Sequence, residues 1–368
     1  MATITLKDVS KAFTKKKGVF SGGEEVTFSM ENINLTFPDG MITSLIGPSG
    51  SGKTTLLKLI AGIERPDSGQ VLFDGEDMTG EEPESKNIGM VFEDYALYPH
   101  FDVEDNILSR FIFSRRTRNE ADGLQDVREE KLKNISQSLE FDLKYLRERM
   151  PDTLSAGEKQ RVALGRCIAF NPELFLLDEP FSGFDPHLRE KFRLRLHELL
   201  QKYSITTICV VHDQKEARLL SDRTVIMRAG KIVQSGDFEE VYQQPADVFV
   251  AEFLSKHQEM KGINLLPGVL LDPVYEGRII GFRPDEVNLL KEGVDKSLVC
   301  EVSFSRRLPG RDEIQLEVEE KKEKFELSLL VSEDWGEFQA MDTVRIKPDN
   351  ILIFSSESEK LLDSRSIE

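Results

Sequence analysis

The stretch GPSGSGKTT, at positions 47–55, restricts the possible folds of this chain more than any other part of the sequence. It has the spacing of a P-loop, in which glycines let the backbone curl and turn its N–H groups toward phosphate oxygens. The preceding run MITSLI predicts a buried strand, and the following run TTLLKLIAGI predicts a helix whose N-terminus attracts the same anion. A chance match in a glycine-rich loop does not require such flanks, so we expect a phosphate-binding strand–loop–helix.

Each residue of this loop has an expected role. Lys53 should reach the terminal phosphates of a nucleotide, and the hydroxyl group of Thr54 should bind Mg²⁺. The other loop residues are expected to line the phosphate site: Gly47, Pro48, Ser49, Gly50, Ser51, Gly52 and Thr55.

A second apolar strand ends in two carboxylates, in the run LFLLDEP at positions 174–180. Asp178 is suited to bind Mg²⁺ directly or through water. Glu179 is then placed to act as general base toward an attacking water. A strand that ends in Asp-Glu is weak evidence alone, but downstream of a phosphate-binding loop it indicates a nucleoside-triphosphate hydrolase.

The pattern of apolar and polar residues changes near residue 240. Before it, short apolar strands alternate with amphipathic helices, which predicts an α/β fold with a parallel sheet. Residues 104–153 contain helical patterns without a strand, which indicates a helical insertion. From about residue 262, short alternating runs predict an all-β barrel or sandwich. The polar tail SSESEKLLDSRSIE is expected to be frayed.

Charge and cysteine content exclude several classes of protein. The net charge of −18 argues against DNA or RNA as a partner. The three cysteines, Cys167, Cys209 and Cys300, are far apart in sequence, which indicates free thiols in a reducing cytosol. No run approaches 18 consecutive apolar residues, so any membrane role should be peripheral.

Two further motifs suggest a family. LSAGEKQR begins at Leu154 and VVHDQKEA begins at Val210, so they lie on either side of the apolar strand that ends in Asp178 and Glu179. With the P-loop, this order resembles the ATP-binding subunits of ABC transporters, whose own motif reads LSGGQ. The sequence departs from that motif at Ala156 and Glu158. Because alanine is strained at positive φ, we expect Ala156 to have a negative φ.

The resemblance implies roles for residues that the motifs alone do not explain. Ser155, Ala156, Gly157 and Glu158 would receive the γ-phosphate of ATP held by the other subunit of a dimer. His212 would contact the γ-phosphate of its own subunit. Phe13 matches the aromatic residue that stacks on adenine, although core packing or an exposed loop would also explain it. Asp185, in FSGFD, matches the loop that crosses the dimer interface.

Glu93 marks another departure from the family. The run VFEDYALYPH resembles the family pattern VFQxYALYPH, whose glutamine contacts Mg²⁺ and the attacking water. A carboxylate also binds Mg²⁺ through oxygen, so Glu93 is expected at the metal, together with Thr54 and Asp178. Attraction to the metal and repulsion by the γ-phosphate oppose each other, and the net effect on ATP affinity is open. Glu93 could also turn aside and leave its place to water.

The resemblance is strongest to carbohydrate importers, the maltose-transporter ATPase family. It implies an ATPase core at residues 1–240, with a helical subdomain at about 94–160. A linker helix at 241–261 and an OB-like β domain at 262–368 would follow. The implied cofactors are ATP and Mg²⁺.

The implied partners place the chain at the cytoplasmic face of the cell membrane. They are a second copy or a paralogous ATPase, two transmembrane permease subunits and, indirectly, a solute-binding protein. A sugar or glycoside is the first expectation for the solute. Polyamines, glycerol phosphate or iron are alternatives, and a soluble ABC ATPase acting on nucleic acid or ribosomes disagrees with the charge.

Overall fold

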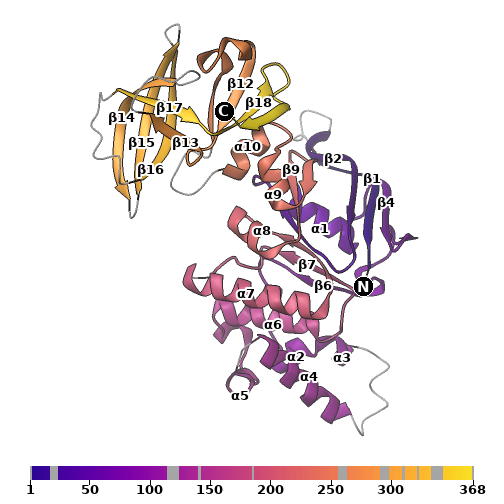
Figure 1. The fold of residues 1–368 in the computed structure, drawn as a ribbon. Coiled ribbons are helices and arrows are strands. Elements are labelled where there is room, and N and C mark those ends of the chain that lie inside the picture. Colours follow the sequence, from indigo (N-terminus) through magenta and orange to yellow (C-terminus); the bar gives the residue numbers. More distant parts are fainter. Residues whose placement is uncertain are drawn as a thin grey trace. The chain divides into compact units, whose positions relative to one another are not determined.

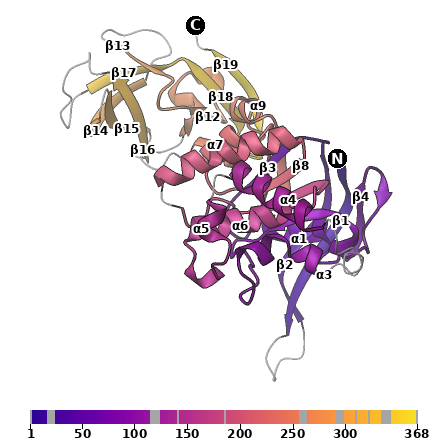
Figure 2. The same cartoon turned by 90° about the horizontal axis from the view of Figure 1, so that it is seen from below.

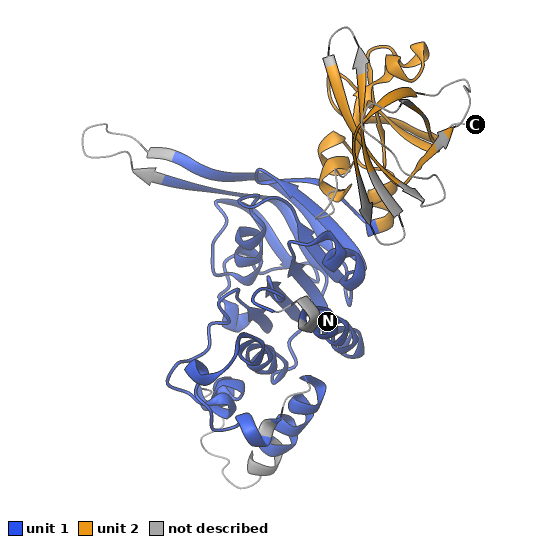
Figure 3. Ribbon diagram, turned by 90° about the vertical axis from the view of Figure 1, so that its left-hand side faces the viewer, with its two compact units in different colours: residues 1–238 blue, residues 239–368 orange. Residues whose placement is uncertain are grey.

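The computed structural model describes two compact units of the chain, residues 1–238 and residues 239–368 (Figure 3). Each unit is described by itself. The described residues are 2–16, 24–113, 124–139, 142–184, 186–255, 263–290, 298–308, 311–320, 323–332 and 343–366.

The first unit is built around a six-stranded sheet with the order β10-β9-β3-β8-β7-β6. All neighbours are parallel except β10, which pairs antiparallel with β9. Its strands are β3 (Ile42–Ile46), β6 (Ile88–Val91), β7 (Leu174–Asp178), β8 (Thr206–Val210), β9 (Arg223–Arg228) and β10 (Lys231–Gly236). Every residue of β3, β7 and β8 is buried, which explains their continuous apolar sequences. The predicted α/β core is confirmed.

A second sheet of this unit is antiparallel, with the order β2-β1-β4-β5. Its strands are β1 (Ile4–Lys16), β2 (Glu24–Phe37), β4 (Ser68–Phe73) and β5 (Glu76–Asp77). Helix α1 (Lys53–Ala61) shares one hydrophobic core with both sheets, to which Leu6, Leu57 and Leu176 contribute. The loop between β3 and α1 is therefore fixed at both of its ends, because β3 and α1 both pack into this core.

The helices of the first unit follow the predicted pattern (Figure 1). Besides α1 they are α2 (Val103–Ile107), α3 (Ser109–Phe113), α4 (Leu124–Leu139), α5 (Leu143–Leu146), α6 (Ala156–Ile168), α7 (Pro186–Tyr203) and α8 (Gln214–Leu220), with short 3₁₀ helices at η1 (Pro83–Ser85) and η3 (Pro151–Thr153). Helices α2 to α5 form the expected helical insertion between β6 and β7, and Figure 2 shows it from below.

A buried asparagine fixes the entry to this insertion. The side-chain oxygen of Asn106 accepts a hydrogen bond from the backbone N–H of Tyr98 at 2.8 Å. Its amide nitrogen donates to the carbonyls of Tyr98, Phe101 and Asp102. The aromatic loop after β6 therefore has a defined shape although several of its side chains are exposed.

The segment TKKKGVFSGGEEVTFSM belongs largely to a strand ladder. Strands β1 and β2 pair from Ile4↔Phe37 to Lys16↔Glu24, with residues 17–23 outside the described part. Alternating apolar and polar side chains near Phe13 and Phe28 allow pairing across the hairpin.

The second unit consists of α9 (Phe238–Gln243), α10 (Val248–Ser255) and two antiparallel sheets, of order β11-β12-β18-β19 and β13-β17-β14-β15-β16. The strands are β11 (Asn264–Pro267), β12 (Arg278–Phe282), β13 (Val287–Leu290), β14 (Leu298–Leu308), β15 (Arg311–Glu320), β16 (Glu323–Ser332), β17 (Thr343–Pro348), β18 (Asn350–Ser355) and β19 (Leu361–Ser366), with 3₁₀ helices η4 (Gly268–Leu270) and η5 (Pro273–Tyr275). The predicted all-β region is confirmed.

One detail of this unit differs from the sequence expectations. The polar tail is not frayed as far as Ser366, where its described part ends, because β19 pairs with β18 from Phe354↔Leu361 to Asn350↔Ser366. Helix α10, which lies in the predicted linker, packs through Val248 and Ala251 against the four-stranded sheet. Among the described residues, no helix is long and apolar enough to span a membrane.

Lys86 is a buried cation at the end of the P-loop helix. It is 2% exposed, and its Nζ donates to the carbonyl of Ile60 at 3.2 Å. Burial lowers the pKa of Lys86 to about 8, against an opposing effect of Glu81.

We predict that Lys86 makes the stability of the fold depend on pH. Between about pH 8 and about pH 10.5, the unfolded chain holds this proton more firmly than the folded chain, so the free energy of unfolding rises with pH. In Lys86→Met, this pH-dependent rise in the free energy of unfolding, which is on the order of 3 kcal/mol, should be absent. Urea unfolding at about pH 7 and about pH 10 measures it, with the exposed Lys231→Met as control. An equal rise in Lys86→Met and wild type would contradict the assignment.

Candidate active site

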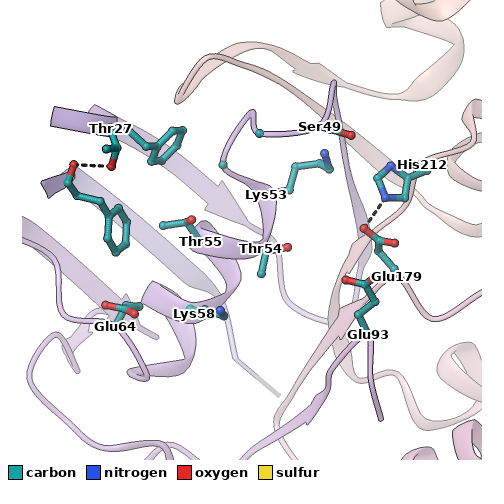
Figure 4. A pocket seen from close by; sticks show the side chains of 14 residues that line it. Thr27, Ser49, Lys53, Thr54, Thr55, Lys58, Glu64, Glu93, Glu179 and His212 are labelled. Carbon is teal, nitrogen blue, oxygen red and sulfur yellow. Dashed lines mark hydrogen bonds and ion pairs between the residues drawn. The ribbon is translucent and has the colours of Figure 1, made fainter. Parts of the chain in front are cut away.

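A cavity of about 770 Å³ lies over the P-loop and brings together residues from distant parts of the first unit (Figure 4). Its lining residues are Phe13, Thr27, Phe28, Ser49, Gly50, Gly52, Lys53, Thr54, Thr55, Lys58, Glu64, Glu93, Glu179 and His212. The sequence singled out most of them, from the P-loop, the acidic strand end, the aromatic loop and the histidine after β8. The parallel sheet explains this convergence, because β3, β6, β7 and β8 end at the same edge.

The loop before α1 has the geometry of a phosphate cradle. Gly52 precedes the helix with φ of 105°, and a Cβ there would lie 2.7 Å from Cζ of Phe28. Nζ of Lys53 donates to the carbonyls of Gly47 and Pro48 at 2.9 and 3.1 Å. Burial lowers the pKa of Lys53, while the charges of Glu179 and Asp178 oppose that shift. A bound phosphate would give this half-desolvated ammonium a stronger partner than carbonyl oxygens.

Thr54 and Asp178 join the P-loop to the acidic strand. Oγ1 of Thr54 donates to Oδ1 of Asp178 at 3.0 Å. Asp178 is 4% exposed, and burial raises its pKa although the Thr54 hydrogen bond opposes the rise. The nearby charges of Glu179 and Glu93 raise it further. A cation bound here would stabilise the ionised carboxylate.

These residues fit a magnesium ion that also binds phosphate. Within the described ranges, no three His, Cys, Asp or Glu residues form a complete metal site. Mg²⁺ commonly uses one or two carboxylates and completes its shell with phosphate oxygens and water. Thr54 and Asp178 would hold it, and Glu93 lies in the same cavity.

Glu179 is held in an unusual backbone conformation beside His212. Its φ is 53°, and its N–H donates to the carbonyl of Val210 at 3.1 Å. Oε1 of Glu179 is hydrogen-bonded to Nε2 of His212, and both side chains line the cavity (Figure 4). Left-handed non-glycine residues concentrate at functional sites, because only a rigid surrounding holds them there. The carboxylate is placed to accept a proton from a water in the cavity.

The segment Ser155–Glu158 does not line this cavity. Ser155 caps α6, and Ser155 and Glu158 form a reciprocal capping box. Oε2 of Glu158 accepts from the N–H and the hydroxyl of Ser155 at 2.8 and 2.7 Å. The hydrogen bond from the Ser155 hydroxyl to Glu158 must break before that hydroxyl can donate to a phosphate.

Other expectations at this segment have definite outcomes. Ala156 lies in α6 and is not among the described residues with positive φ, as predicted. Gly157 is helical too, and a Cβ there would lie 2.9 Å from Cε1 of Phe184. Asp185 lies outside the described residues.

The sequence interpretation missed four lining residues, Thr27, Phe28, Lys58 and Glu64. Phe28 pairs with Phe13 across the β1–β2 ladder, and their ring centroids are 6.4 Å apart at 39°. Oγ1 of Thr27 donates to the carbonyl of Phe13 at 3.0 Å. Lys58 lies one helical turn after Thr54, a spacing that could have indicated it. Phe28 gave no such signal, because its position depends on strand register.

Comparisons with known proteins agree with this geometry. The family described as ABC transporter matches residues 30–182. A sulfate/thiosulfate import ATP-binding protein of Pseudomonas syringae pv. tomato is 35% identical over 333 residues, which cover 90% of this chain and 93% of the relative. The Fe(3+) ions import ATP-binding protein of Mannheimia succiniciproducens is 36% identical, over 81% of this chain and 83% of its own.

A solved structure supports the same conclusion for the core. The dimeric, post-hydrolysis ATP-binding cassette MJ0796, bound to ADP and Pi, has a TM-score of 0.54 and 28% identity. The match covers 64% of this chain and 98% of the cassette chain. The chain belongs to the ATP-binding proteins of ABC transporters, and it is an ATPase of that family.

We predict that Glu179→Gln retains ATP binding and loses almost all turnover. An amide keeps the shape of the side chain but cannot accept the proton, and removal of a general base typically costs about 10²–10⁴-fold in rate. Steady-state phosphate release measures turnover, and equilibrium ATP binding serves as the fold control. Glu173→Gln, an exposed carboxylate just before the same strand, is the matched variant and should stay active. Near-normal turnover in Glu179→Gln would exclude the role.

A second prediction concerns the two aromatic rings. Phe28→Leu keeps an apolar contact on Gly52 but removes a stacking surface, so ATP binding should weaken roughly two- to ten-fold. Tripolyphosphate, which has no base, should bind the variant and wild type equally. Val26→Ala, on the same strand and exposed, is the control. Equal losses for ATP and tripolyphosphate would show that Phe28 only supports the P-loop.

Proposed function

We propose that this chain is the ATP-hydrolysing subunit of an importer for an inorganic ion, with sulfate or thiosulfate as the first candidate. The observation that carries the proposal is the extent of similarity to a sulfate/thiosulfate import ATP-binding protein, which covers 90% of this chain. That similarity extends past the ATPase core into the second unit, whereas the solved cassette covers only 64% of the chain. A shared second unit favours a shared type of transporter over a shared ATPase alone.

Fe(3+) is the second candidate, since an iron-import relative is 36% identical over 81% of this chain. Iron was among the alternatives drawn from the sequence. The relatives do not support the expectation of a sugar or glycoside, since they import sulfate, thiosulfate or Fe(3+).

The arrangement of the site favours a dimer. Ser155 and Glu158 lie outside the cavity that holds Lys53 and Glu179, so one protomer does not bring its own α6 start to its own phosphates. We infer that each protomer, or a paralogous partner, presents Ser155–Glu158 to the ATP of the other. The related cassette is dimeric in its ADP-bound structure.

Within each protomer the residues divide the work of hydrolysis. Bound ATP would supply the phosphoryl group, and Mg²⁺ would neutralise part of its charge. Lys53 and the N–H groups at the start of α1 would hold the phosphates, and Thr54 and Asp178 would hold the metal. Glu179 takes the proton of the attacking water, and His212 orients Glu179 through their hydrogen bond. Phe13 and Phe28, which line the same cavity, would contact the base.

An aromatic surface at the start of the helical insertion suits the membrane partners. Tyr98, His100, Phe101 and Phe113 form ring contacts with each other, and Phe113 is 58% exposed. Exposed apolar rings on a charged protein mark an interaction site. We propose that this surface binds the two permease subunits and places the chain at the cytoplasmic face of the membrane. A solute-binding protein completes the system, and the charge of −18 disfavours nucleic acid.

Reconstitution tests the proposed function. The chain, assembled with the permease subunits and solute-binding protein of its transporter, should drive ATP-dependent uptake of radiolabelled sulfate into liposomes. Thiosulfate, Fe(3+) and maltose are parallel substrates, and Glu179→Gln assemblies give the background. Uptake of sulfate or thiosulfate alone supports the proposal. Uptake of Fe(3+) alone selects the second candidate, and uptake of maltose alone rejects both.

A further inference from the structure

The segment that carries Glu93 is attached to helix α6 at both of its ends. At the first end, β6 lies against Cys167, whose Sγ donates to the carbonyl of Met90 at 3.4 Å. A Cβ on Gly89 would come within 3.0 Å of Cβ of Cys167, so strand and helix are in close contact. This attachment fixes the chain just before it enters the cavity wall.

At the second end, Arg166 holds the loop after Glu93. Its Nη1 donates to the carbonyl of Ala96 at 2.7 Å, and its Nη2 donates to the carbonyl of Tyr95 at 3.2 Å. The guanidinium carbon also lies 5.5 Å from the ring centroid of Tyr98. One side chain thus contacts three residues of the loop, through two charge-assisted hydrogen bonds and one ring.

The held backbone is strained. Tyr95 and Ala96 are consecutive non-glycine residues in the left-handed region, with φ of 64° and 43°. This conformation is costly for residues with a Cβ and persists only where neighbouring groups impose it. Oη of Tyr95 adds a hydrogen bond to the carbonyl of Ser182 at 3.0 Å, in the loop after Glu179. Without these contacts the turn would relax.

We infer that Arg166 is a positioning residue for Glu93. Only residues 91–94 separate the two attachments, so the strained turn restricts the backbone that carries Glu93, whose side chain lines the cavity. Because α6 also begins with Ser155–Glu158, a displacement of that segment by a partner's ATP is transmitted to Glu93 by one rigid helix. The inference rests on the proposed site of Mg²⁺-ATP, but the contacts that carry it belong to the protein alone.

A purely structural role for Arg166 is the competing account. Arg166 lies in the last turn of α6, where a cation also favours the helix dipole, so its loss could simply loosen the helix. The two accounts differ in what happens when Glu93 loses its charge. A positioning residue loses its effect on metal binding in that background, whereas a general stabiliser keeps it.

The first experiment uses the nucleotide-free protein. In Arg166→Gln, amide hydrogen exchange of residues 93–98 should become about ten-fold faster or more, because two hydrogen bonds to a charged group are lost. Exchange in β7 and α1 should not change. Lys159→Gln removes a charge from the same helix and should leave residues 93–98 as in wild type. Unchanged exchange at residues 93–98, or equal acceleration throughout α6 and β7, would overturn the inference.

The second experiment is a double-mutant cycle on metal binding. The Mg²⁺ concentration at half-maximal binding of a fluorescent ATP analogue should shift at least about three-fold in Arg166→Gln. In the Glu93→Gln background, Arg166→Gln should shift it no further. An equal shift in both backgrounds would overturn the inference.

A conservative variant keeps the test valid if Arg166→Gln does not fold. Arg166→Lys keeps the charge but carries its donors on a single nitrogen. It should therefore give an intermediate exchange rate at residues 93–98 and an intermediate shift in the Mg²⁺ concentration at half-maximal binding. Failure of the analogue to bind wild type at all would reject the proposed nucleotide site, and the exchange result would still decide the role of Arg166.

Discussion

The hydrogen bond between Thr54 and Asp178 is the contact on which the rest of the site depends. It joins the start of α1, which follows β3, to the end of β7, although β8 lies between these two strands in the sheet. Once these ends are fixed, Glu179 follows Asp178 directly, and His212 follows β8 beside it. Burial raises the pKa of the Asp178 carboxyl, and a bound cation would stabilise its ionised form. These features support the proposal that the cavity receives a metal-bound phosphate.

Local motifs made most of this site predictable from the sequence. The P-loop, the acidic strand end and the histidine after β8 are short patterns whose geometry is set by a few neighbouring residues. Phe28 was missed because its place opposite Phe13 follows from the register of a hairpin, which no local pattern specifies. The same limit applies to β19, whose polar residues form a strand only because β18 offers an open edge. Asp185 and the division into domains remain predictions.

Glu93 and Glu158 are carboxylates at positions where the related family has side-chain amides. The surroundings of these two residues differ from each other. Glu158 is bonded to Ser155 and lies near Arg149, so the pKa of its carboxyl is lowered and its charge is satisfied within the protomer. Glu93 faces the cavity, and its charge acts on Asp178. The first difference, at Glu158, strengthens a helix start, and the second, at Glu93, adds negative charge to the proposed metal site. The strained turn held by Arg166 indicates that this second charge is kept in place.

Electron paramagnetic resonance of Mn²⁺, used in place of Mg²⁺, tests most directly whether Thr54 and Asp178 form the metal side of an ATP site. With ATP present, wild type should bind Mn²⁺, and Asp178→Asn should weaken that binding at least about ten-fold, because the buried charge is lost. ATP binding without metal should persist in the variant and show that it is folded. Equal Mn²⁺ affinity of the ATP complexes of wild type and Asp178→Asn would contradict the account.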